Sequence, residues 1–238
     1  MILAVLQARL TSTRLPGKVL LPLAGAPMIL RQIERVRRAR RIDALLVATS
    51  VEPSDDPLAE RLQAEGVEVR RGPLEDVLAR FAGAVSGRPA HHVVRLTGDC
   101  PLSDPAIIDA TIAHHLAQDA DYTHNRYDPH GWPKGQDVEV IRTAALLRSA
   151  AEATSPLARE HVTWDIRNRP DLYRVARLDP PLDEGQVRWT VDTPEDFAFV
   201  SAVFETLYPV DPAFSSDAVR DFVRGRPDLA MLGGERRI

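Results

Sequence analysis

The sequence predicts an α/β domain built on a parallel or mixed β-sheet. Short β-branched and apolar runs recur along the first half, and stretches with helical periodicity separate them. Strands that alternate with helices of this length form βαβ units, which place the strands in one sheet. At 238 residues the chain suits one sizeable domain, residues 1–238, and no repeat or flexible linker divides it.

The first half is expected to alternate strands with helices. The expected strands are 2–6, 44–50, 67–70 and 91–99, and the helical patterns span 27–41, 55–66, 75–85 and 105–118. Pro27 suits the first turn of the first helix, Ser54 can cap the second, and Gly66 can end it. Asp104 can cap the helix that starts at Pro105.

The pattern changes after Asp121. Segments 121–125, 136–141 and 172–178 are predicted strands, with helices between about 143 and 168. We expect 121–180 to form a β-rich annex that serves acceptor binding or dimerisation. Segment 186–192 (QVRWTVD) is then a predicted strand, and 193–208 is an amphipathic helix capped by Thr193 with Pro194 in its first position.

The composition excludes several classes of protein. No apolar run approaches about 18 residues, so we expect no membrane span, and the apolar start is too short for a signal peptide. A single cysteine, Cys100, excludes internal disulfides and fits a reducing cytoplasm. The net charge of −4 argues against nucleic-acid binding. Cationic clusters are therefore local and indicate a local anion.

The segment QARLTSTRLPGK, residues 7–18, is the most unusual of these clusters. It follows the first strand directly, where loops at the carboxyl ends of parallel strands form the ligand crevice of an α/β sheet. Arg9, Arg14 and Lys18 would repel one another there without a counter-anion, and a polyphosphate supplies one. The alternative is an ordinary solvated basic loop.

This loop is not the P-loop of kinases and GTPases. A P-loop needs a glycine, four residues and then Gly-Lys-Ser/Thr, because the hydroxyl binds magnesium. Val19 follows Gly17 and Lys18 here, and Ser12 stands five residues before Gly17 where the leading glycine belongs. Kinase and GTPase functions therefore lose their main support.

Two carboxylates follow other predicted strands at the same edge of the sheet. Asp99 ends the stretch RLTGD, and Asp192 ends RWTVD. Magnesium is usually held by one or two carboxylates together with phosphate oxygens. Either acid alone is explained better as a helix N-cap. The pair, combined with the cationic loop, favours a magnesium site.

Five stretches carry a resemblance to a known family. They are QARLTSTRLPGKVLLPLAGAPM, VVRLTGDCPL, DVEV, REHVTWDI and RWTVDTPEDF, in this order. Together they resemble the CMP-sugar synthetases, which are the 3-deoxy-manno-octulosonate and acylneuraminate cytidylyltransferases, and most of all the spore-coat polysaccharide biosynthesis cytidylyltransferases. The resemblance covers residues 1–208, and residues 209–238 match nothing of use.

The resemblance implies a three-layer α/β/α sandwich of the GT-A-like nucleotidyltransferase type, with a Rossmann-like mixed sheet. It implies a cytoplasmic, homodimeric enzyme of surface polysaccharide biosynthesis that binds CTP and Mg²⁺. A sugar hydroxyl would attack the α-phosphate and release pyrophosphate. One departure is Cys100, which stands where the sugar-acid synthetases carry an acidic residue, so their sugar specificity does not transfer.

The resemblance also implies roles for individual residues. Asp99 and Asp192 would bind Mg²⁺. Arg14, Lys18 and Asp99 would be catalytic: the two cations would offset charge on the α-phosphate and on the leaving pyrophosphate, and Asp99 would hold the metal. The nucleotide-binding set is Ala8, Arg9, Ser12, Thr13, Arg14, Lys18, Arg71, Arg80, Thr97 and Gly98.

Residues 70–80 (RRGPLEDVLAR) are expected to meet the base. Gly72 permits close backbone approach, and Arg71 and Arg80 are the candidate contacts. The alternative is that Arg80 lies on an ordinary helix face and that Glu75 or Asp76 caps this helix.

The acceptor sugar is expected near the annex. Asp137 and Glu139 would share one face of a strand, and the expected helical residues Arg159, Glu160 and His161 would complete the set. An arginine there suits a carboxylate or phosphate on the sugar, whereas a structural role is the alternative for His161.

Other clusters are discounted. The histidine pairs at 91–92 and 114–115 lack the cysteine or acidic partners of a zinc site. Cys100 is expected to pack as a small apolar group. The run RVRRARR, residues 35–41, is expected on the solvated face of the first helix.

Two other functions compete. A GT-A glycosyltransferase would use a finished nucleotide-sugar, but its Asp-x-Asp signature is absent at Asp99, where the chain reads Asp-Cys-Pro. A noncatalytic nucleotide-binding protein would be favoured by loss of a metal carboxylate or of Lys18, and all three residues are present.

Overall fold

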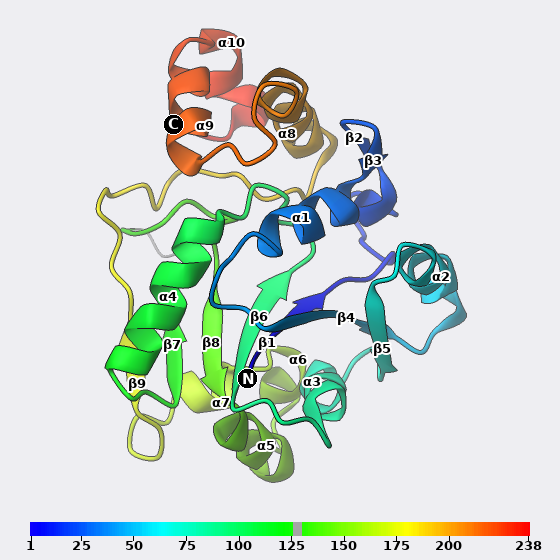
Figure 1. The fold of residues 1–238 in the computed structure, drawn as a ribbon, viewed down its shortest axis with the longest axis vertical. Helices are drawn as coiled ribbons and strands as arrows, with labels where there is room; N and C mark the ends of the chain where they lie inside the picture. Colours follow the sequence, from blue (N-terminus) through cyan, green and yellow to red (C-terminus); the bar gives the residue numbers. More distant parts are fainter. Residues whose placement is uncertain (126–129) are drawn as a thin grey trace.

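The computed structural model describes residues 1–125 and 130–238, and a seven-stranded mixed sheet forms its centre (Figure 1). The first four strands in the order are parallel to one another, the fifth is antiparallel to both neighbours, and the last two are parallel. The order is β5 (Glu68–Gly72), β4 (Ala44–Ser50), β1 (Ile2–Gln7), β6 (His92–Thr97), β8 (Glu139–Arg142), β7 (Tyr122–His124) and β9 (Val175–Arg177).

Helices cover both faces of this sheet, as the alternation along β1 requires. Ala4 and Leu6 point into one apolar core, and Leu3 and Val5 point into the other. The first core is built with α1 (Met28–Val36), α2 (Asp56–Ala64), α4 (Pro105–Ala117), α8 (Pro194–Leu207) and α9 (Ser216–Arg224). The second is built with α3 (Val77–Val85), α5 (Thr143–Glu152) and α7 (Trp164–Arg167). The predicted α/β/α fold class is therefore confirmed.

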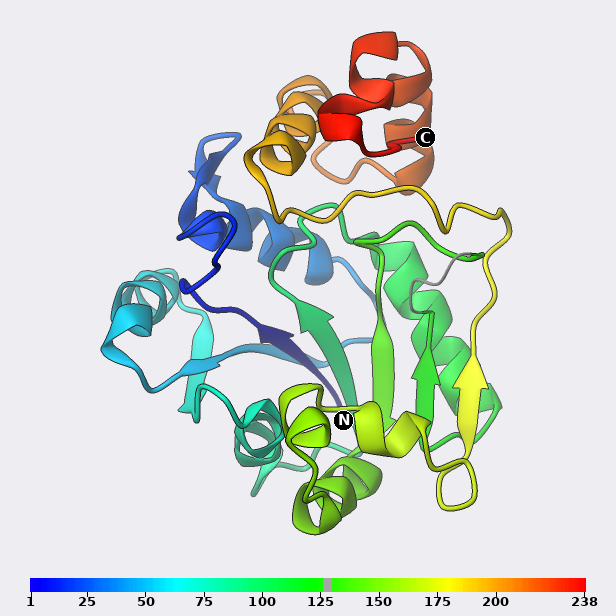
Figure 2. The ribbon, with the colours of Figure 1, turned by 180° about the vertical axis from the view of Figure 1, so that it is seen from behind.

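Shorter elements connect these layers. They are the 3₁₀ helices η1 (Lys18–Leu20), η2 (Pro53–Asp55) and η3 (Leu232–Gly234), the hairpin β2 (Pro22–Leu23) and β3 (Ala26–Pro27), and helices α6 (Pro156–Glu160) and α10 (Pro227–Ala230). Helices α8, α9 and α10 gather beyond the carboxyl ends of the central strands (Figure 1). Figure 2 shows the segment that precedes α8 running between these helices and the sheet.

Several predicted helix signals are confirmed. The Asp104 side chain accepts a hydrogen bond from the Ala106 amide at 2.8 Å, as an N-cap does. Gly66 follows α2 with a φ of +69°, a left-handed conformation that glycine adopts without strain. Thr193 and Asp196 form a capping box at the start of α8. Helix α1 is shorter than expected and ends at Val36.

Some predictions about elements were wrong. Ser54 does not cap α2, because it lies within η2, and Asp55 holds the N-cap position without a side-chain cap bond. Segment 186–192 is not a strand, and an isolated bridge between Lys134 and Arg188 is its only ladder contact in the described chain. Arg35 is not on a solvated face, since it is 1% exposed and donates to the carbonyls of Ser103 and Phe214.

The segment 121–180 differs in form from a separate β-rich annex. Its strands β7, β8 and β9 extend the main sheet, and its helices α5, α6 and α7 contain more residues than its strands. A role in dimerisation stays a prediction. Within the described ranges, no helix combines the length and apolar character that crossing a bilayer requires.

Candidate active site

A cavity of about 630 Å³ opens at the carboxyl ends of β1 and β6, a size that suits a nucleotide-sized ligand. The parallel register pairs Gln7 with Thr97, so the loops that follow these two strands begin side by side. The lining residues are Gln7, Ala8, Arg9, Thr11, Ser12, Thr13, Arg14, Lys18, Val19, Leu74, Glu75, Val77, Arg80, Arg95, Thr97, Gly98, Asp99, Glu160, His161 and Asp192.

A buried acid fixes the start of the cationic loop. Asp55 is completely buried, and its Oδ1 accepts a hydrogen bond from the Leu10 amide at 2.7 Å. Its Oδ2 accepts from the amide and hydroxyl of Ser50, at the end of β4. The loop then turns back, because the Gly17 amide donates to the Leu10 carbonyl at 3.0 Å and Gly17 has a φ of +71°. Lys18 follows directly and begins η1.

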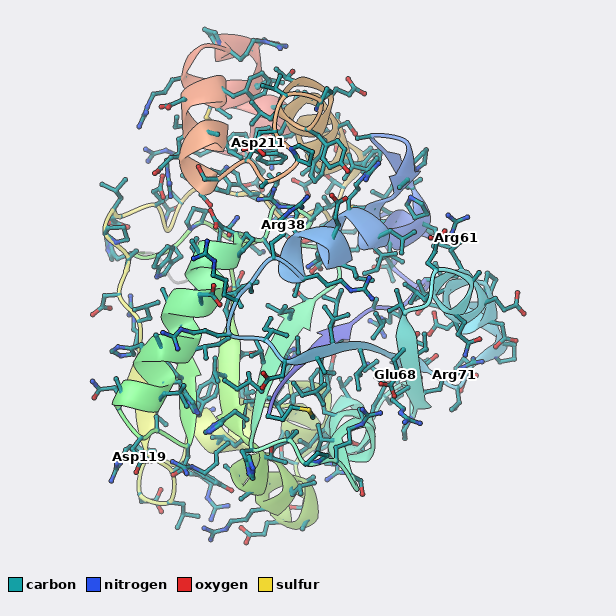
Figure 3. The ribbon with its side chains drawn as sticks, viewed as in Figure 1. Arg38, Arg61, Glu68, Arg71, Asp119 and Asp211 are labelled. Atoms are coloured by element: carbon teal, nitrogen blue, oxygen red, sulfur yellow. The ribbon has the colours of Figure 1, made fainter. Side chains whose placement is uncertain are left out.

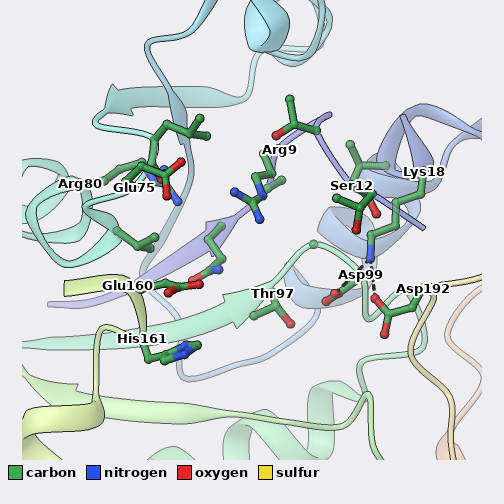
Figure 4. Close-up of a pocket in the computed structure, with 18 of the residues that line it drawn as sticks. Arg9, Ser12, Lys18, Glu75, Arg80, Thr97, Asp99, Glu160, His161 and Asp192 are labelled. Atoms are coloured by element: carbon green, nitrogen blue, oxygen red, sulfur yellow. Dashed lines mark hydrogen bonds and ion pairs between the residues drawn. The ribbon is translucent and has the colours of Figure 1, made fainter. Parts of the chain in front are cut away.

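Lys18 joins the two acids that the sequence places far apart (Figure 4). Its Nζ lies 3.2 Å from Asp99 Oδ2 and 2.9 Å from Asp192 Oδ1, and it also donates to the Val191 carbonyl at 2.6 Å. The Lys18 side chain is 9% exposed, whereas that of Asp99 is 30% exposed toward the cavity. The predicted convergence of Lys18, Asp99 and Asp192 is therefore present in the structure.

Backbone contacts bring the second acid to the first. The Val191 amide donates to the Asp99 carbonyl at 2.8 Å, and the Thr190 hydroxyl donates to the same oxygen at 3.1 Å. Gly98 permits this approach on the other side, because a Cβ there would lie 2.9 Å from the Ala8 Cβ. The loop after β6 is thus held between β1 and the segment before α8.

Asp192 lies among three cations. Its Oδ2 is 3.0 Å from Arg14 Nη2 and 2.7 Å from Arg188 Nη2, in addition to the contact of Oδ1 with Lys18. Burial alone would raise the pKa of Asp192, but the hydrogen bonds and charges of Lys18, Arg188 and Arg14 outweigh it and hold the pKa below its ordinary value. Asp192 is therefore a carboxylate at neutral pH.

The chemistry of these two acids suits a divalent cation such as Mg²⁺. Among the residues that the structure describes, no group of three or more His, Cys, Asp or Glu is placed to hold a metal ion. Asp99 and Asp192 nevertheless each bring an oxygen within 3.2 Å of one nitrogen atom. Mg²⁺ accepts one or two carboxylates and completes its shell with water and phosphate oxygens. The donor set therefore fits Mg²⁺ when phosphate supplies further ligands.

Arg80 lines the opposite end of the cavity, and its guanidinium holds the loop before α3. Its Nη1 donates to the Pro73 carbonyl at 2.8 Å and more weakly to that of Leu74. Burial, together with the nearby charge of Arg9, lowers the pKa of Arg80. Gly72 does permit a close approach, but the approaching group is Arg80, whose Cα would lie 3.0 Å from a Cβ at this position.

Arg71 lies outside the cavity, contrary to the expectation of a base contact. It projects from the edge strand β5 beside α2 (Figure 3). Its side chain donates to the carbonyls of Ser50 and Glu52 and pairs with Asp56 at 2.6 Å. These contacts hold β4, η2 and α2 together, so the geometry favours a structural role.

The predicted acceptor residues divide in two. Glu160 and His161 line the cavity, but Arg159 turns away, with Nη2 2.6 Å from Asp76 Oδ2 and Nη1 2.6 Å from the Ala150 carbonyl. Asp76, which caps α3 through the Ala79 amide, is thereby tied to α5 and α6. Arg159 is a structural residue here, because the shared carboxylate already occupies its guanidinium.

Asp137 and Glu139 also lie outside the cavity. Strand β8 begins at Glu139, so the two residues do not share a strand face. Glu139 is 3% exposed and accepts hydrogen bonds from Arg95, Tyr122 and Thr163, which explains its burial. Both residues were expected beside the acceptor sugar, and the predicted position was wrong for both.

Seven lining residues were not predicted individually, namely Gln7, Thr11, Val19, Leu74, Glu75, Val77 and Arg95. All but Val19 and Arg95 lie within the predicted segments 7–18 and 70–80. Arg95 carried a usable signal, because it precedes Thr97 and Asp99 at alternate positions and alternate residues share a face of a strand. Its Nε donates to the Gln7 side chain at 3.1 Å, which also explains the position of Gln7.

Solved structures show the same architecture. A cytidylyltransferase from Leptospira borgpetersenii serovar Hardjo-bovis (strain JB197) superposes with a TM-score of 0.88 and 26% identity, covering 96% of this chain and 95% of that one. A CMP:2-keto-3-deoxy-manno-octonic acid synthetase complexed with CTP shares the fold, with a TM-score of 0.66 and 19% identity over 87% of this chain and 99% of that one. The chain thus has the nucleotidyltransferase fold.

Sequence comparison then identifies the family. The family model described as Cytidylyltransferase matches residues 3–206, so the chain belongs to the cytidylyltransferases. The spore coat polysaccharide biosynthesis protein SpsF of Bacillus subtilis (strain 168) is 38% identical over 236 residues, which cover 96% of each protein. The 3-deoxy-manno-octulosonate cytidylyltransferase of Anaeromyxobacter dehalogenans (strain 2CP-C) is 34% identical over 95% of this chain and 96% of that protein. The predicted family is confirmed.

Proposed function

We propose that this cytidylyltransferase transfers CMP from Mg²⁺-bound CTP to a hydroxyl of a sugar or sugar acid and releases pyrophosphate. The observation that carries this proposal is the contact of Lys18, at the end of the cationic loop, with both Asp99 and Asp192 in the cavity. The names of the Bacillus and Anaeromyxobacter relatives support a sugar acceptor for surface polysaccharide. We further propose that the enzyme is a cytoplasmic homodimer.

The residues divide the work by position. Arg9, Ser12, Thr13 and Arg14 would bind the triphosphate, and Lys18 would offset charge on the α-phosphate and on the leaving pyrophosphate. Asp99 and Asp192 would hold Mg²⁺, which when bound screens phosphate charge and lowers the pKa of the attacking hydroxyl. Nucleotidyl transfer needs little covalent chemistry from the protein, so positioning and charge account for the rate.

The remaining lining residues would orient the base and the acceptor. Ala8, Thr97 and Gly98 present small or hydroxylated surfaces to the cavity, and a nucleoside would lie against them. Arg80 would act on the base through the loop carbonyls that it holds. Glu160 and His161 would form hydrogen bonds with hydroxyls of the sugar. The Glu160 carboxylate can accept them, and the His161 ring can donate or accept them.

The direct test is pyrophosphate release when CTP, Mg²⁺ and a panel of sugars and sugar acids are mixed with the enzyme. We expect release with at least one acceptor, and loss of about 100-fold or more in kcat for Asp99→Asn and for Asp192→Asn, because each removes a carboxylate that would hold Mg²⁺ and so weakens the offset of phosphate charge in the transition state. Asp221→Asn, an exposed acid on α9, is the matched control and should leave the rate unchanged.

Two outcomes would contradict this function. Binding of CTP without turnover of any acceptor would favour a noncatalytic nucleotide-binding protein. Near-normal rates in both folded aspartate variants would remove the proposed metal site.

A further inference from the structure

Arg237 is a charged side chain with no exposed surface, near the end of a segment that the family model does not cover. Its Nη2 lies 2.8 Å from Asp196 Oδ1, and its Nη1 donates to the Arg188 carbonyl at 2.8 Å. The Trp189 indole donates to the Arg237 carbonyl at 2.9 Å. The segment that carries Arg237 is thus hydrogen-bonded directly to residues 188 and 189, a few residues before Asp192.

A continuous chain of charged contacts leads from Arg237 to the active site. Asp196 is 1% exposed, and its Oδ2 accepts from Arg188 Nη2 at 2.9 Å and from the Asp192 amide at 2.9 Å. The same Arg188 Nη2 lies 2.7 Å from Asp192 Oδ2. The opposite oxygen of Asp192 faces Lys18. Arg188 does not line the cavity, so it contacts Asp192 on the side that faces away from the cavity.

The balance of charge in this chain depends on Arg237. Asp196 is shared by two arginines, and Arg188 is shared by two acids. Without Arg237, Asp196 Oδ1 would keep the Arg188 Nε contact at 3.0 Å but lose its second guanidinium, and the Arg188 carbonyl would lose the donor that holds it. Arg188 already contacts both oxygens of Asp196, and without Arg237 it alone of these two arginines would offset the charge of this buried carboxylate. A closer approach of Arg188 to Asp196 would weaken its contact with Asp192 Oδ2.

We propose that Arg237 is a positioning residue that fixes the carboxylate of Asp192 for the metal-bound triphosphate, through Asp196 and Arg188. The inference rests on the proposed function of Asp192. It gives residues 225–238 a role in the active site, although none of them lines the cavity in the described part of the chain. Partners that orient metal ligands in this way typically change metal affinity by about 10–100-fold when removed.

The test compares Arg237→Met with Arg220→Met. Arg220 is a matched control, because it is 8% exposed, pairs with the acids Glu184 and Asp217, and lies over the Trp189 ring without reaching Asp192. Mg²⁺ is titrated calorimetrically into each protein saturated with α,β-methylene CTP, and binding of the same nucleotide is measured separately with EDTA present. Melting temperatures are recorded in parallel.

We expect both variants to melt at lower temperature, while only Arg237→Met raises the apparent Mg²⁺ dissociation constant, by about tenfold. Nucleotide affinity in EDTA should change little. Arg237→Lys keeps the charge but loses the forked geometry, and should bind Mg²⁺ between wild type and Arg237→Met; it also serves as the test if Arg237→Met does not fold.

Equal Mg²⁺ constants for the Arg220 variant and for the folded Arg237 variants would overturn the inference. Absence of Mg²⁺-dependent binding in the wild-type protein would instead contradict the proposed function, so the two failures are distinguishable.

Discussion

Lys18 shows how much one side chain can organise. Its ammonium group meets two acids and a carbonyl, and together these contacts use the three donors that a lysine has. The amphipathic stem is buried, so the charge is held in one place instead of moving freely as on an exposed lysine. Together with Arg9 and Arg14 in the same cavity, this fixed cation favours a ligand whose own charge is large and negative.

Lys18→Ala should therefore weaken binding of CTP more than binding of CMP. The extra phosphates of CTP interact with the cation, and loss of Lys18 also leaves Asp99 and Asp192 to repel them. We expect roughly a tenfold larger loss for the triphosphate, measured by calorimetry without metal. Equal losses for CTP and CMP would contradict the phosphate role, and Lys18→Arg is the control that keeps the charge.

At the scale of elements, the cationic loop is held by an acid from another part of the chain. Asp55 belongs to η2, yet it accepts from Leu10 in the loop and from Ser50 at the end of β4. These bonds satisfy buried donors that would otherwise be unpaired. The loop thus takes its starting direction from β4 as well as from β1.

Asp55→Ala should lower the free energy of unfolding by about 1–3 kcal/mol, because it leaves the Leu10 amide and the Ser50 hydroxyl without their partner. It should also raise KM for CTP more than it lowers kcat, since the loop is loosened before substrate binds. Denaturant unfolding and steady-state kinetics measure the two effects. Asp56→Ala, which removes only a half-exposed pair with Arg71, is the matched control and should change neither by much. A KM that matches the control would show that the loop does not depend on Asp55.

The elements themselves were largely predictable, because their signals are local. Apolar runs marked β1 and β4, the capping residues Asp104 and Thr193 marked the starts of α4 and α8, and Gly66 marked the end of α2. Segment 186–192 alternates apolar and polar residues, a pattern typical of a strand, but it is no strand. It is buried between the sheet and the C-terminal helices, so its pattern reflects burial without a strand partner.

The site was predictable where residues follow strand ends and less so where side chains turn. Lys18 and Asp99 follow from the rule that carboxyl ends of parallel strands share an edge. Asp192 reaches the same edge although the strand predicted before it is absent. Arg159 does not, because only the packing of α6 on α3 reveals that Asp76 already holds its guanidinium. Glu139 likewise accepts hydrogen bonds from residues on β6 and β7, and no local sequence pattern predicts these contacts. Spacing along the chain predicts which face of a helix or strand a residue lies on. It does not predict which residue of another element a long side chain contacts.

At the scale of the whole molecule, stability should depend on pH through buried groups far from the cavity. His115 on α4 is 1% exposed and faces His92 on β6 at 3.0 Å and the Thr123 hydroxyl on β7 at 2.9 Å. Burial lowers the pKa of His115 to about 4, and the neighbouring His92 and Arg142 act in the same direction against weaker opposition from Asp121 and Asp119. Burial opposes but does not prevent a lowered pKa for Asp196, which Arg188, the Asp192 amide and Arg237 hold down.

Both shifts make the fold less stable in acid. The unfolded chain takes up a proton at His115 below its ordinary pKa of 6.5, whereas the folded protein resists until about pH 4, so stability is lost as pH falls through this window. Asp196 adds a further loss below its ordinary pKa of 3.8. We therefore expect a melting temperature that is nearly constant from about pH 7 to 8 and declines steadily below about 6.5.

His115→Gln should flatten the part of this decline between pH 6.5 and 4, because the amide takes up no proton there, even if it lowers the melting temperature at pH 7.5. His114→Gln, which changes the less buried neighbour on the same helix, should leave the wild-type slope intact. Melting curves collected across this range by calorimetry make the comparison. A slope that is the same in wild type and His115→Gln would assign the acid sensitivity to other groups.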